Sequence, residues 1–178
     1  MATHKLMTGE QFDARAKEDR RRWELLDGEL IETPTATARH NVIQTRLTMA
    51  LYPKVVVDGG GGVLTATEFA FGENRFQPDL AVLLHEKWIN VEQDRAPVLI
   101  IPNIAVEIVS PSEVVNKLER KVAVYLDKSV AEVWVINLSL RHMYVHTADS
   151  VRKLRNTDTL ETPLLSGWSL PVAQLFAS

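Results

Sequence analysis

Two acidic residues stand inside apolar stretches that otherwise favour buried β-strands. Asp79 lies in Gln77-Pro-Asp-Leu-Ala-Val-Leu83, and Glu107 lies in Asn103-Ile-Ala-Val-Glu-Ile-Val109. An ionised carboxylate in an apolar strand is costly unless it is paired, hydrogen-bonded or bound to a metal. Hard cations such as Mg²⁺ take carboxylate and carbonyl oxygens as ligands. If the two strands are neighbours in one sheet, Asp79 and Glu107 can therefore converge on one cation.

A helix expected over roughly residues 113–128 supplies lysines to the same region. Lys117, Lys121 and Tyr125 are four residues apart and share one face of that helix. A lysine aimed at the cation would stabilise an attacking hydroxide or the charge that develops on a phosphoryl group. Spacing alone favours a solvated stripe, so this interpretation depends on whether the face meets the sheet.

Each of these side chains also has a purely structural interpretation. Glu107 could face water at a strand end, or form a structural ion pair with a lysine such as Lys121. Pro-Asp is an ordinary turn pair, so Asp79 alone indicates little. His40 could approach the site from its helix, but a helical histidine is more often a packing or surface residue. The chemical interpretation therefore rests on several residues together.

The N-terminal part of the chain predicts a helix and a hairpin. Thr8, with Gln11 three residues later, is typical of a capped helix over roughly residues 8–18. Asp27-Gly28 separates two short apolar runs and predicts a β-hairpin over residues 23–32. Glu29 would then begin the returning strand.

A longer helix should follow the hairpin and lead to a glycine-rich turn. Thr35 or Thr37 can cap it, and Pro53 should kink or end it. The run Gly59–Gly62 is a turn and not a phosphate loop, because a strand-like segment over residues 63–71 follows it. The apolar positions of the helix recur at helical spacing: Val42, Ile43, Leu47, Ala50 and Leu51.

The remaining segments alternate between strands and helices, which favours an α/β fold. Residues 86–102 have little periodicity and predict a surface loop, and Ser110-Pro-Ser112 should cap the helix over residues 113–128. Strands are expected at residues 77–84, 104–109, 133–136, 140–146 and 151–154, with a short closing segment at 172–176.

Length and composition predict one globular domain over residues 1–178. An apolar fraction of 46% and a charged fraction of 24% are those of an ordinary globular protein. The chain has no cysteine, so disulfides, thiolate nucleophiles and cysteine-ligated metals are excluded. We expect a cytoplasmic protein, because no signal peptide or membrane-spanning run is recognisable. The net charge of −3 argues against a surface coated with basic residues.

Six stretches, taken in order, resemble the Uma-type restriction endonuclease family of the PD-(D/E)XK nuclease superfamily. They are Glu-Leu-Leu-Asp-Gly-Glu-Leu-Ile-Glu, Ala-Arg-His-Asn-x-Ile, Pro-Asp-Leu-Ala-Val, Val-Glu-Ile-Val-Ser-Pro-Ser, Lys-Val-Ala-Val-Tyr and Glu-Val-Trp-Val-Ile. The resemblance runs from about Thr8 to Phe176. It implies a restriction-endonuclease-like α/β core, in which helices flank a mixed central sheet and the N-terminal β-hairpin is an addition.

The resemblance also implies roles for individual residues. Asp79 is the aspartate of the Pro-Asp motif, Glu107 is the acidic residue of the second motif, and the Ile108 carbonyl is a further metal ligand. Glu29 matches an early glutamate that completes such sites. The superfamily's usual lysine position, two residues after the glutamate, is Val109 here, and the matching lysine of the Uma-type pattern is Lys121.

Two positions depart from the family pattern. Lys117 stands where relatives often have an acidic residue, and Gln77 stands where a basic residue often precedes Pro-Asp. The first alters the charge near the site, and the second weakens phosphate contact. Neither removes a metal ligand.

The function implied by the resemblance is Mg²⁺-dependent endonuclease activity, with Mn²⁺ as a possible substitute, on the phosphodiester bonds of DNA. Two alternatives stay open: a non-catalytic DNA-binding or protein-interaction module that keeps the fold, and hydrolysis of a small nucleotide phosphodiester. Superfamily members that cut duplexes are frequently dimers. By that analogy the tail, with Trp168 and Phe176, would supply a homodimer interface.

Overall fold

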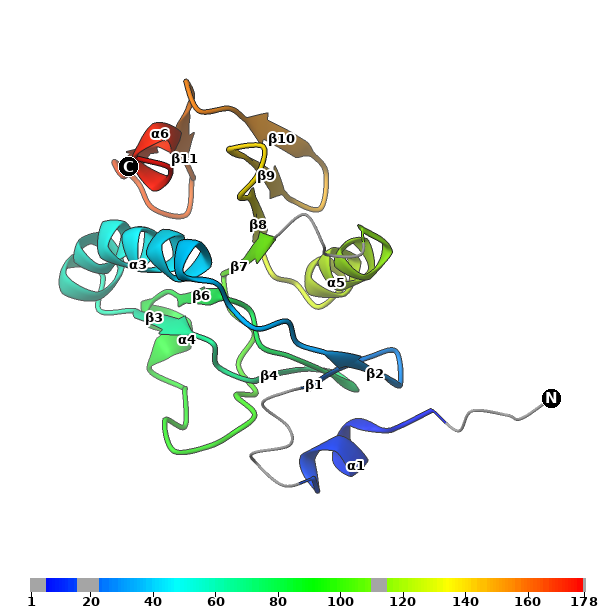
Figure 1. Ribbon diagram of the computed structural model, residues 1–178. Helices are drawn as coiled ribbons and strands as arrows, with labels where there is room; N and C mark the ends of the chain where they lie inside the picture. The colour runs from blue at the N-terminus through cyan, green and yellow to red at the C-terminus, as the bar shows by residue number, and fades with distance from the viewer. Residues whose placement is uncertain (1–5, 16–22, 110–114, 178) are drawn as a thin grey trace.

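The centre of the protein is a six-stranded mixed sheet, seen in a computed structural model that describes residues 6–15, 23–109 and 115–177 (Figure 1). The strand order is β10-β9-β8-β7-β6-β3. β7 and β8 run parallel, and the other neighbouring strands run antiparallel. The strands are β3 (Gly62–Thr65), β6 (Leu80–Leu83), β7 (Ile104–Val109), β8 (Glu132–Asn137), β9 (His142–His146) and β10 (Val151–Leu154).

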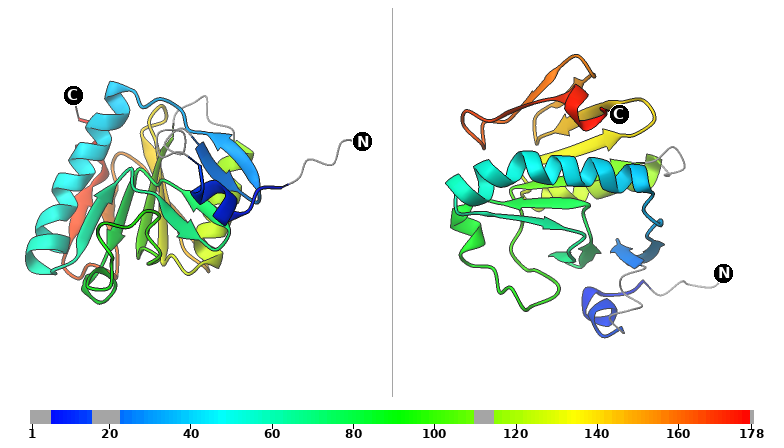
Figure 2. Two further views of the ribbon diagram at one scale, coloured as in Figure 1. Left: turned by 90° about the horizontal axis from the view of Figure 1, so that it is seen from below. Right: turned by 60° about the vertical axis from the view of Figure 1, so that its left-hand side comes forward.

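Helices cover both faces of this sheet, as Figure 2 shows. α3 (Ala38–Tyr52) lies on one face and continues into the π-helix η1 (Pro53–Asp58), whereas α5 (Val115–Asp127) lies on the other. Ile43, Leu47 and Leu51 of α3 pack into one apolar core, and Val122 and Tyr125 of α5 pack into a second. The predicted mixed sheet flanked by helices is therefore confirmed.

The predicted N-terminal hairpin is present and forms part of a second sheet. Asp27 and Gly28 turn the chain with positive φ angles of 51° and 81°, which is the geometry that favours Asp-Gly in two-residue hairpins. The sheet has the order β2-β1-β5-β4. Its strands are β1 (Trp23–Leu26), β2 (Glu29–Glu32), β4 (Phe69–Phe71) and β5 (Asn74–Phe76).

A short helix, α1 (Gly9–Asp13), precedes the hairpin. Thr8 and Gln11 form the predicted capping box. Arg75 of β5 holds the end of this helix, because its guanidinium donates to both carboxylate oxygens of Asp13 at 2.8 and 2.7 Å. Most of the rest of the predicted helix falls in residues 16–22, outside the described part of the chain.

Two segments and one side chain differ from the sequence prediction. Residues 63–71 form two strands in different sheets, because Ala66 turns the chain with φ 45°. Pro53 ends the α-helix as expected, since α3 stops at Tyr52 with Pro53 as its C-cap, and a π-helix starts at Pro53 with a helical φ of −57°. A short helix, α4 (His85–Trp88), lies in the predicted loop. Val42 is also 45% exposed, because it faces away from the sheet.

The C-terminal tail packs across the face that carries α3. It contains β11 (Thr159–Glu161) paired with β12 (Ser169–Pro171), and then α6 (Val172–Leu175). Trp168 stacks on Trp134 with ring centroids 6.0 Å apart and donates to the Ala50 carbonyl, while Phe176 is buried in the core. Both tail side chains suggested for a dimer interface are thus used inside the chain.

Helix length and polarity bear on membrane crossing. Among the described residues, none of the helices is both long and apolar enough to span a bilayer.

The expected cap at residues 110–112 lies outside the described residues.

Candidate active site

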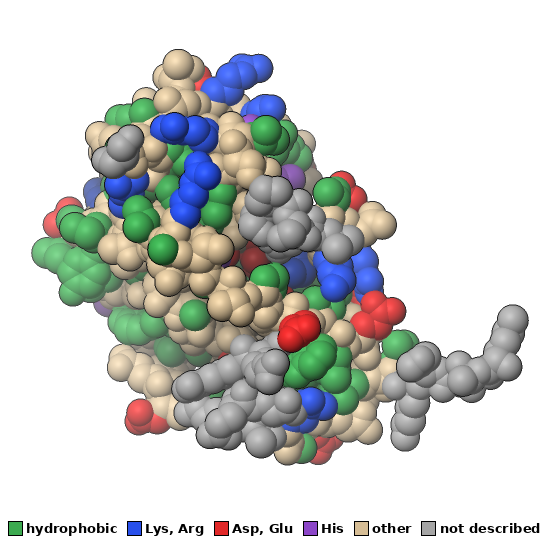
Figure 3. All heavy atoms as spheres, in the orientation of Figure 1, with side chains coloured by type: hydrophobic (Ala, Val, Ile, Leu, Met, Phe, Trp, Pro, Cys, Tyr) green, Lys and Arg blue, Asp and Glu red, His purple; other side chains and the backbone are tan. Residues whose placement is uncertain are grey.

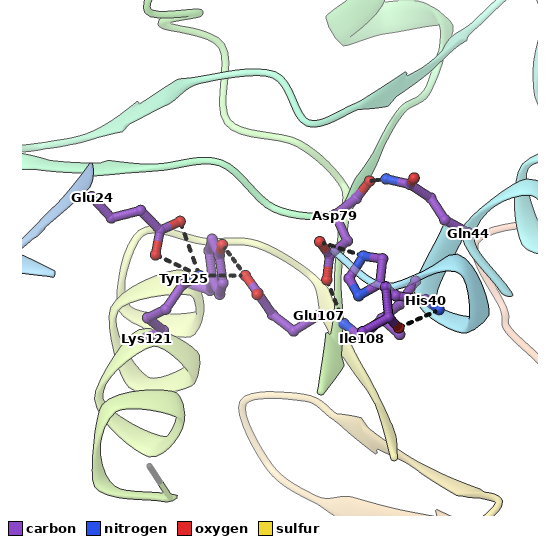
Figure 4. A network of polar contacts seen from close by, with 9 residues as sticks. Glu24, His40, Gln44, Asp79, Glu107, Ile108, Lys121 and Tyr125 are labelled. Atoms are coloured by element: carbon purple, nitrogen blue, oxygen red, sulfur yellow. Dashed lines mark hydrogen bonds and ion pairs between the residues drawn. The ribbon is translucent and has the colours of Figure 1, made fainter. Parts of the chain in front are cut away.

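The sheet brings Asp79 and Glu107 together, because β6 and β7 are antiparallel neighbours. Asp79 directly precedes β6, and its Oδ2 accepts a hydrogen bond from the Ile108 amide of β7 at 2.6 Å. Glu107 is the residue before that amide, so both carboxylates belong to the same end of the sheet. The close-up in Figure 4 shows them between α5 and α3.

One face of α5 meets the sheet at Glu107. Lys121 and Tyr125 lie on that face and are 6% and 0% exposed. The Lys121 ammonium is 2.9 Å from Glu107 Oε1, and the Tyr125 hydroxyl donates to the same oxygen at 2.6 Å. Lys117, four residues before Lys121, is exposed. On this helix, Lys121 therefore lies in the site and Lys117 lies in solvent.

A third carboxylate, Glu24, reaches the same lysine from the hairpin. Glu24 lies in β1 and is 5% exposed. Each of its carboxylate oxygens is 3.0 Å from Lys121 Nζ, and Oε1 also accepts from the Gln77 amide at 2.8 Å. Glu24 of the hairpin thus contacts both the segment before Asp79, through Gln77, and α5, through Lys121.

The glutamate that the sequence predicts for the site is Glu29, next to the turn of the hairpin. Glu29 does not line the pocket. Its carboxylate is 58% exposed and binds Arg120 at 3.0 Å. The structure therefore does not place Glu29 in the site, contrary to the sequence prediction. Glu29 starts β2 right after the turn, so its side chain contacts Arg120 on the outer surface of α5. Glu24 had a recognisable signal: an acidic residue inside an apolar strand, the same feature that pointed to Glu107.

Two polar side chains of α3 hold Asp79 from the opposite side. His40 Nε2 is 3.1 Å from Asp79 Oδ1, and Gln44 Nε2 donates to the Asp79 backbone carbonyl at 2.5 Å. Thr37 caps this helix by accepting from the His40 amide, which fixes the first turn at the site. His40 therefore does approach the site.

These residues line a pocket of about 280 Å³. A larger hollow of about 640 Å³ lies elsewhere, beside Glu132. Both carboxylate oxygens of Glu132 are already engaged there, by the Trp134 indole at 2.7 Å and the Thr162 hydroxyl at 2.9 Å. The smaller pocket is the candidate site, because Asp79, Glu107 and Lys121 all line it, whereas none of these three lines the larger hollow. Its lining includes Glu24, Thr37, His40, Gln44, Asp79, Glu107, Ile108 and Lys121.

Burial and charge shift the protonation of this cluster. Burial raises the pKa of Glu107 to about 8, against the opposing attraction of Lys121, and repulsion from Asp79 and Glu24 adds to the rise. Burial by itself lowers the pKa of Lys121, but attraction by Glu107 and Glu24 outweighs it and raises that pKa. Lys121 therefore keeps its charge at neutral pH.

The donor set fits a hard divalent cation. Both contacts to Glu107 are made on Oε1, so no described residue engages its Oε2. Repulsion among the carboxylates, which raises the pKa of Glu107, would be relieved by a cation. Within the described ranges, no three His, Asp or Glu side chains are arranged to hold a metal alone. An ion with few protein ligands and several waters, as Mg²⁺ prefers, matches this arrangement.

Comparison with known proteins places the chain in a family. Residues 10–173 match Uma2, described as "Putative restriction endonuclease". The chain belongs to this family. A similar solved structure is that of "a putative nuclease belonging to DUF820" from Anabaena variabilis ATCC 29413, with a TM-score of 0.85 and 19% identity over 96% of this chain and 97% of that one. No curated protein matched the sequence.

In this Uma2 chain the residue two positions after Glu107 is buried in the core. This residue, Val109, is 5% exposed and lies in the same core as Val122 and Tyr125 of α5. The lysine that reaches the pocket comes from α5 instead, one helical turn before Tyr125.

The two glutamates of the hairpin give a matched pair of variants. Glu24→Gln should lower the hydrolysis rate by about 10- to 100-fold, the usual effect of losing a residue that positions an active-site group. Glu29→Gln should leave the rate within about threefold, because it changes only an exposed ion pair. Rates at saturating metal would check both, and equal losses would contradict the placement of Glu24.

Proposed function

We propose that this Uma2 chain is a metal-dependent nuclease that hydrolyses phosphodiester bonds of DNA. The observation that carries the proposal is that Asp79, just before β6, Glu107 of β7 and Lys121 of α5 line one pocket. Family membership supports the same reaction class.

Asp79 and Glu107, with the Ile108 carbonyl, would hold Mg²⁺ or Mn²⁺. The ion, when bound, supplies Lewis-acid polarisation of the phosphate and a more acidic water. Tyr125 keeps Glu107 in place through its hydroxyl, and the Ile108 amide and His40 do the same for Asp79. These contacts fix the carboxylates before substrate arrives, which limits reorganisation during the reaction.

Lys121 acts as a fixed positive charge. A charged ammonium has three donors and no acceptor, so it cannot take a proton from the attacking water. It can donate to that water and stabilise the charge that develops on the phosphoryl oxygens. Glu24 and Glu107 hold it in place at 2.9 to 3.0 Å.

Cleavage of plasmid and oligonucleotide DNA with Mg²⁺ or Mn²⁺ tests the proposal. We expect cleavage that EDTA abolishes and that Asp79→Asn lowers on the order of 10³-fold, through loss of a metal ligand. Asp149→Asn, an exposed carboxylate in the β9–β10 turn, is the matched control. Residual cutting that is the same in wild type and Asp79→Asn would contradict the assignment.

Calorimetric titration with Mn²⁺ separates this function from a non-catalytic module with the same fold. His40 and the Ile108 amide contact the two Asp79 oxygens, an arrangement that a purely structural role would also use. A nuclease must still bind the ion, and binding should weaken in Asp79→Asn. Absence of Mn²⁺ binding by wild type would favour the module.

A further inference from the structure

Positive charge available to a nucleic acid is scarce in the pocket itself. Lys121 is its one lysine or arginine among the described lining residues, and two carboxylates surround it. The chain as a whole has a net charge of −3. Because phosphate contacts supply most of the affinity for nucleic acids, a polynucleotide substrate needs cations elsewhere on the surface.

β9 arranges three aromatic rings on one face of the large sheet. Met143 and Val145 point into the core, so His142, Tyr144 and His146 lie on the opposite face. Tyr144 contacts both histidines, with ring centroids 5.1 Å from His142 and 6.1 Å from His146. Neighbouring rings of this kind can contact the bases and sugars of a nucleic acid.

β10, the edge strand, adds cations to the same face. Lys153 is directly opposite Tyr144 in the pairing with β9, and its ammonium is 5.5 Å from the tyrosine ring centroid. Arg155 follows the strand. Burial lowers the pKa of His142, and the charges of Lys153 and Arg155 lower it further. His142 itself is only 7% exposed, so the rings that a ligand can reach are those of Tyr144 and His146. Lys153 and Arg155 are exposed.

The strand register connects this face to the pocket. Glu107 of β7 is level with Val135 of β8, Val135 with Tyr144 of β9, and Tyr144 with Lys153 of β10. Three strand spacings separate β7 from β10, which is about 15 Å. In Figure 3, Lys and Arg side chains (blue) lie over the upper part of the molecule, which carries β9 and β10.

We propose that a β9–β10 patch, made of Tyr144, His146, Lys153 and Arg155, binds the sugar-phosphate strand of the nucleic acid beside the cleaved bond. Lys153 and Arg155 contact phosphates, and the rings contact sugars and bases. The proposal rests on the proposed nuclease function for the identity of the ligand. It adds a second contact region, about 15 Å from Glu107 along the sheet, that the catalytic residues do not include.

Equilibrium binding of a fluorescein-labelled 20-nucleotide DNA, single-stranded or duplex, tests this patch with EDTA present so that no cleavage occurs. Lys153→Gln/Arg155→Gln should raise Kd about 10-fold at low salt. It should also flatten the plot of log affinity against log salt by about 1 per lost phosphate contact. The control is Lys54→Gln/Arg95→Gln, which removes the same charge from η1 and the 86–102 loop, beyond the opposite edge of the sheet.

The outcomes separate this proposal from the nuclease assignment. The patch is ruled out if both double variants bind alike, or if wild type does not bind the oligonucleotides, even when wild type cleaves DNA. A loss specific to the Lys153/Arg155 variant supports the patch even when no cleavage is detected with Mg²⁺ or Mn²⁺.

Discussion

Replacing Glu107 by glutamine is expected to abolish metal-dependent hydrolysis and, in the same variant, to stabilise the metal-free protein above pH 7. The activity loss should be on the order of 10³-fold, because the variant removes a charged ligand from the ion. The gain in stability follows from burial, which raises the pKa of Glu107 to about 8. Glutamine keeps an oxygen for Tyr125 and Lys121 but carries no charge to bury.

The direction of the pH dependence follows from where the proton is held. The unfolded chain releases the Glu107 proton near pH 4.5, whereas the folded protein holds it until about pH 8. The contribution to stability is therefore full below pH 4.5 and is lost as the pH rises to about 8. At about 1.4 kcal/mol per pKa unit, the loss amounts to a few kcal/mol.

Urea denaturation in EDTA at pH 5, 6, 7 and 8 measures this effect. Wild type should lose free energy of unfolding across the series, and Glu107→Gln should lose much less. Glu29→Gln, which changes an exposed carboxylate, should follow wild type. A steep loss that is identical in Glu107→Gln would show that another group causes it.

The elements that position the site were predictable where local chemistry determines them. The Asp-Gly turn requires positive φ at both positions, and the uniformly apolar run 104–109 leaves no amphipathic alternative to a buried strand. Sequence patterns also placed Lys121 and Tyr125 on one helix face. That face then proved to be the buried one, which periodicity alone could not decide because it also carries Lys117.

Glu24 shows why the rest of the site was harder to predict. The hairpin contains several acidic residues, and which of them turns inward depends on how β1 pairs with β5 and where α5 crosses the hairpin. Both are contacts between segments far apart in the chain. The sheet β2-β1-β5-β4 is hard to predict from the sequence for the same reason. Its strands β4 and β5 have only three residues each, and β5 pairs with a hairpin that lies more than 35 residues earlier in the chain.

Removing the positive charge of Lys121 should strongly lower the free energy of unfolding. At pH 7 Glu107 still holds its proton, so Lys121→Met leaves the carboxylate of Glu24, which is 5% exposed, buried without its cation. Breaking a buried ion pair by removing one partner typically costs about 3–5 kcal/mol, because the remaining charge is buried without compensation. Denaturant midpoints at pH 7 would measure the loss. Lys117→Met, an exposed change on the same helix, should shift stability by less than about 0.5 kcal/mol.

A second substitution distinguishes lost charge balance from lost packing. In Lys121→Met/Glu24→Gln the carboxylate that Lys121→Met leaves charged at pH 7 is neutralised, so part of the lost free energy of unfolding should return. The coupling energy from the double-mutant cycle should be about 1–3 kcal/mol, as expected for side chains in direct contact. Activity should not return, because neither substitution restores a positive charge beside Glu107. Additive losses in the cycle would mean that Glu24 and Lys121 do not act as a pair, and the hairpin would then have no part in holding the catalytic lysine.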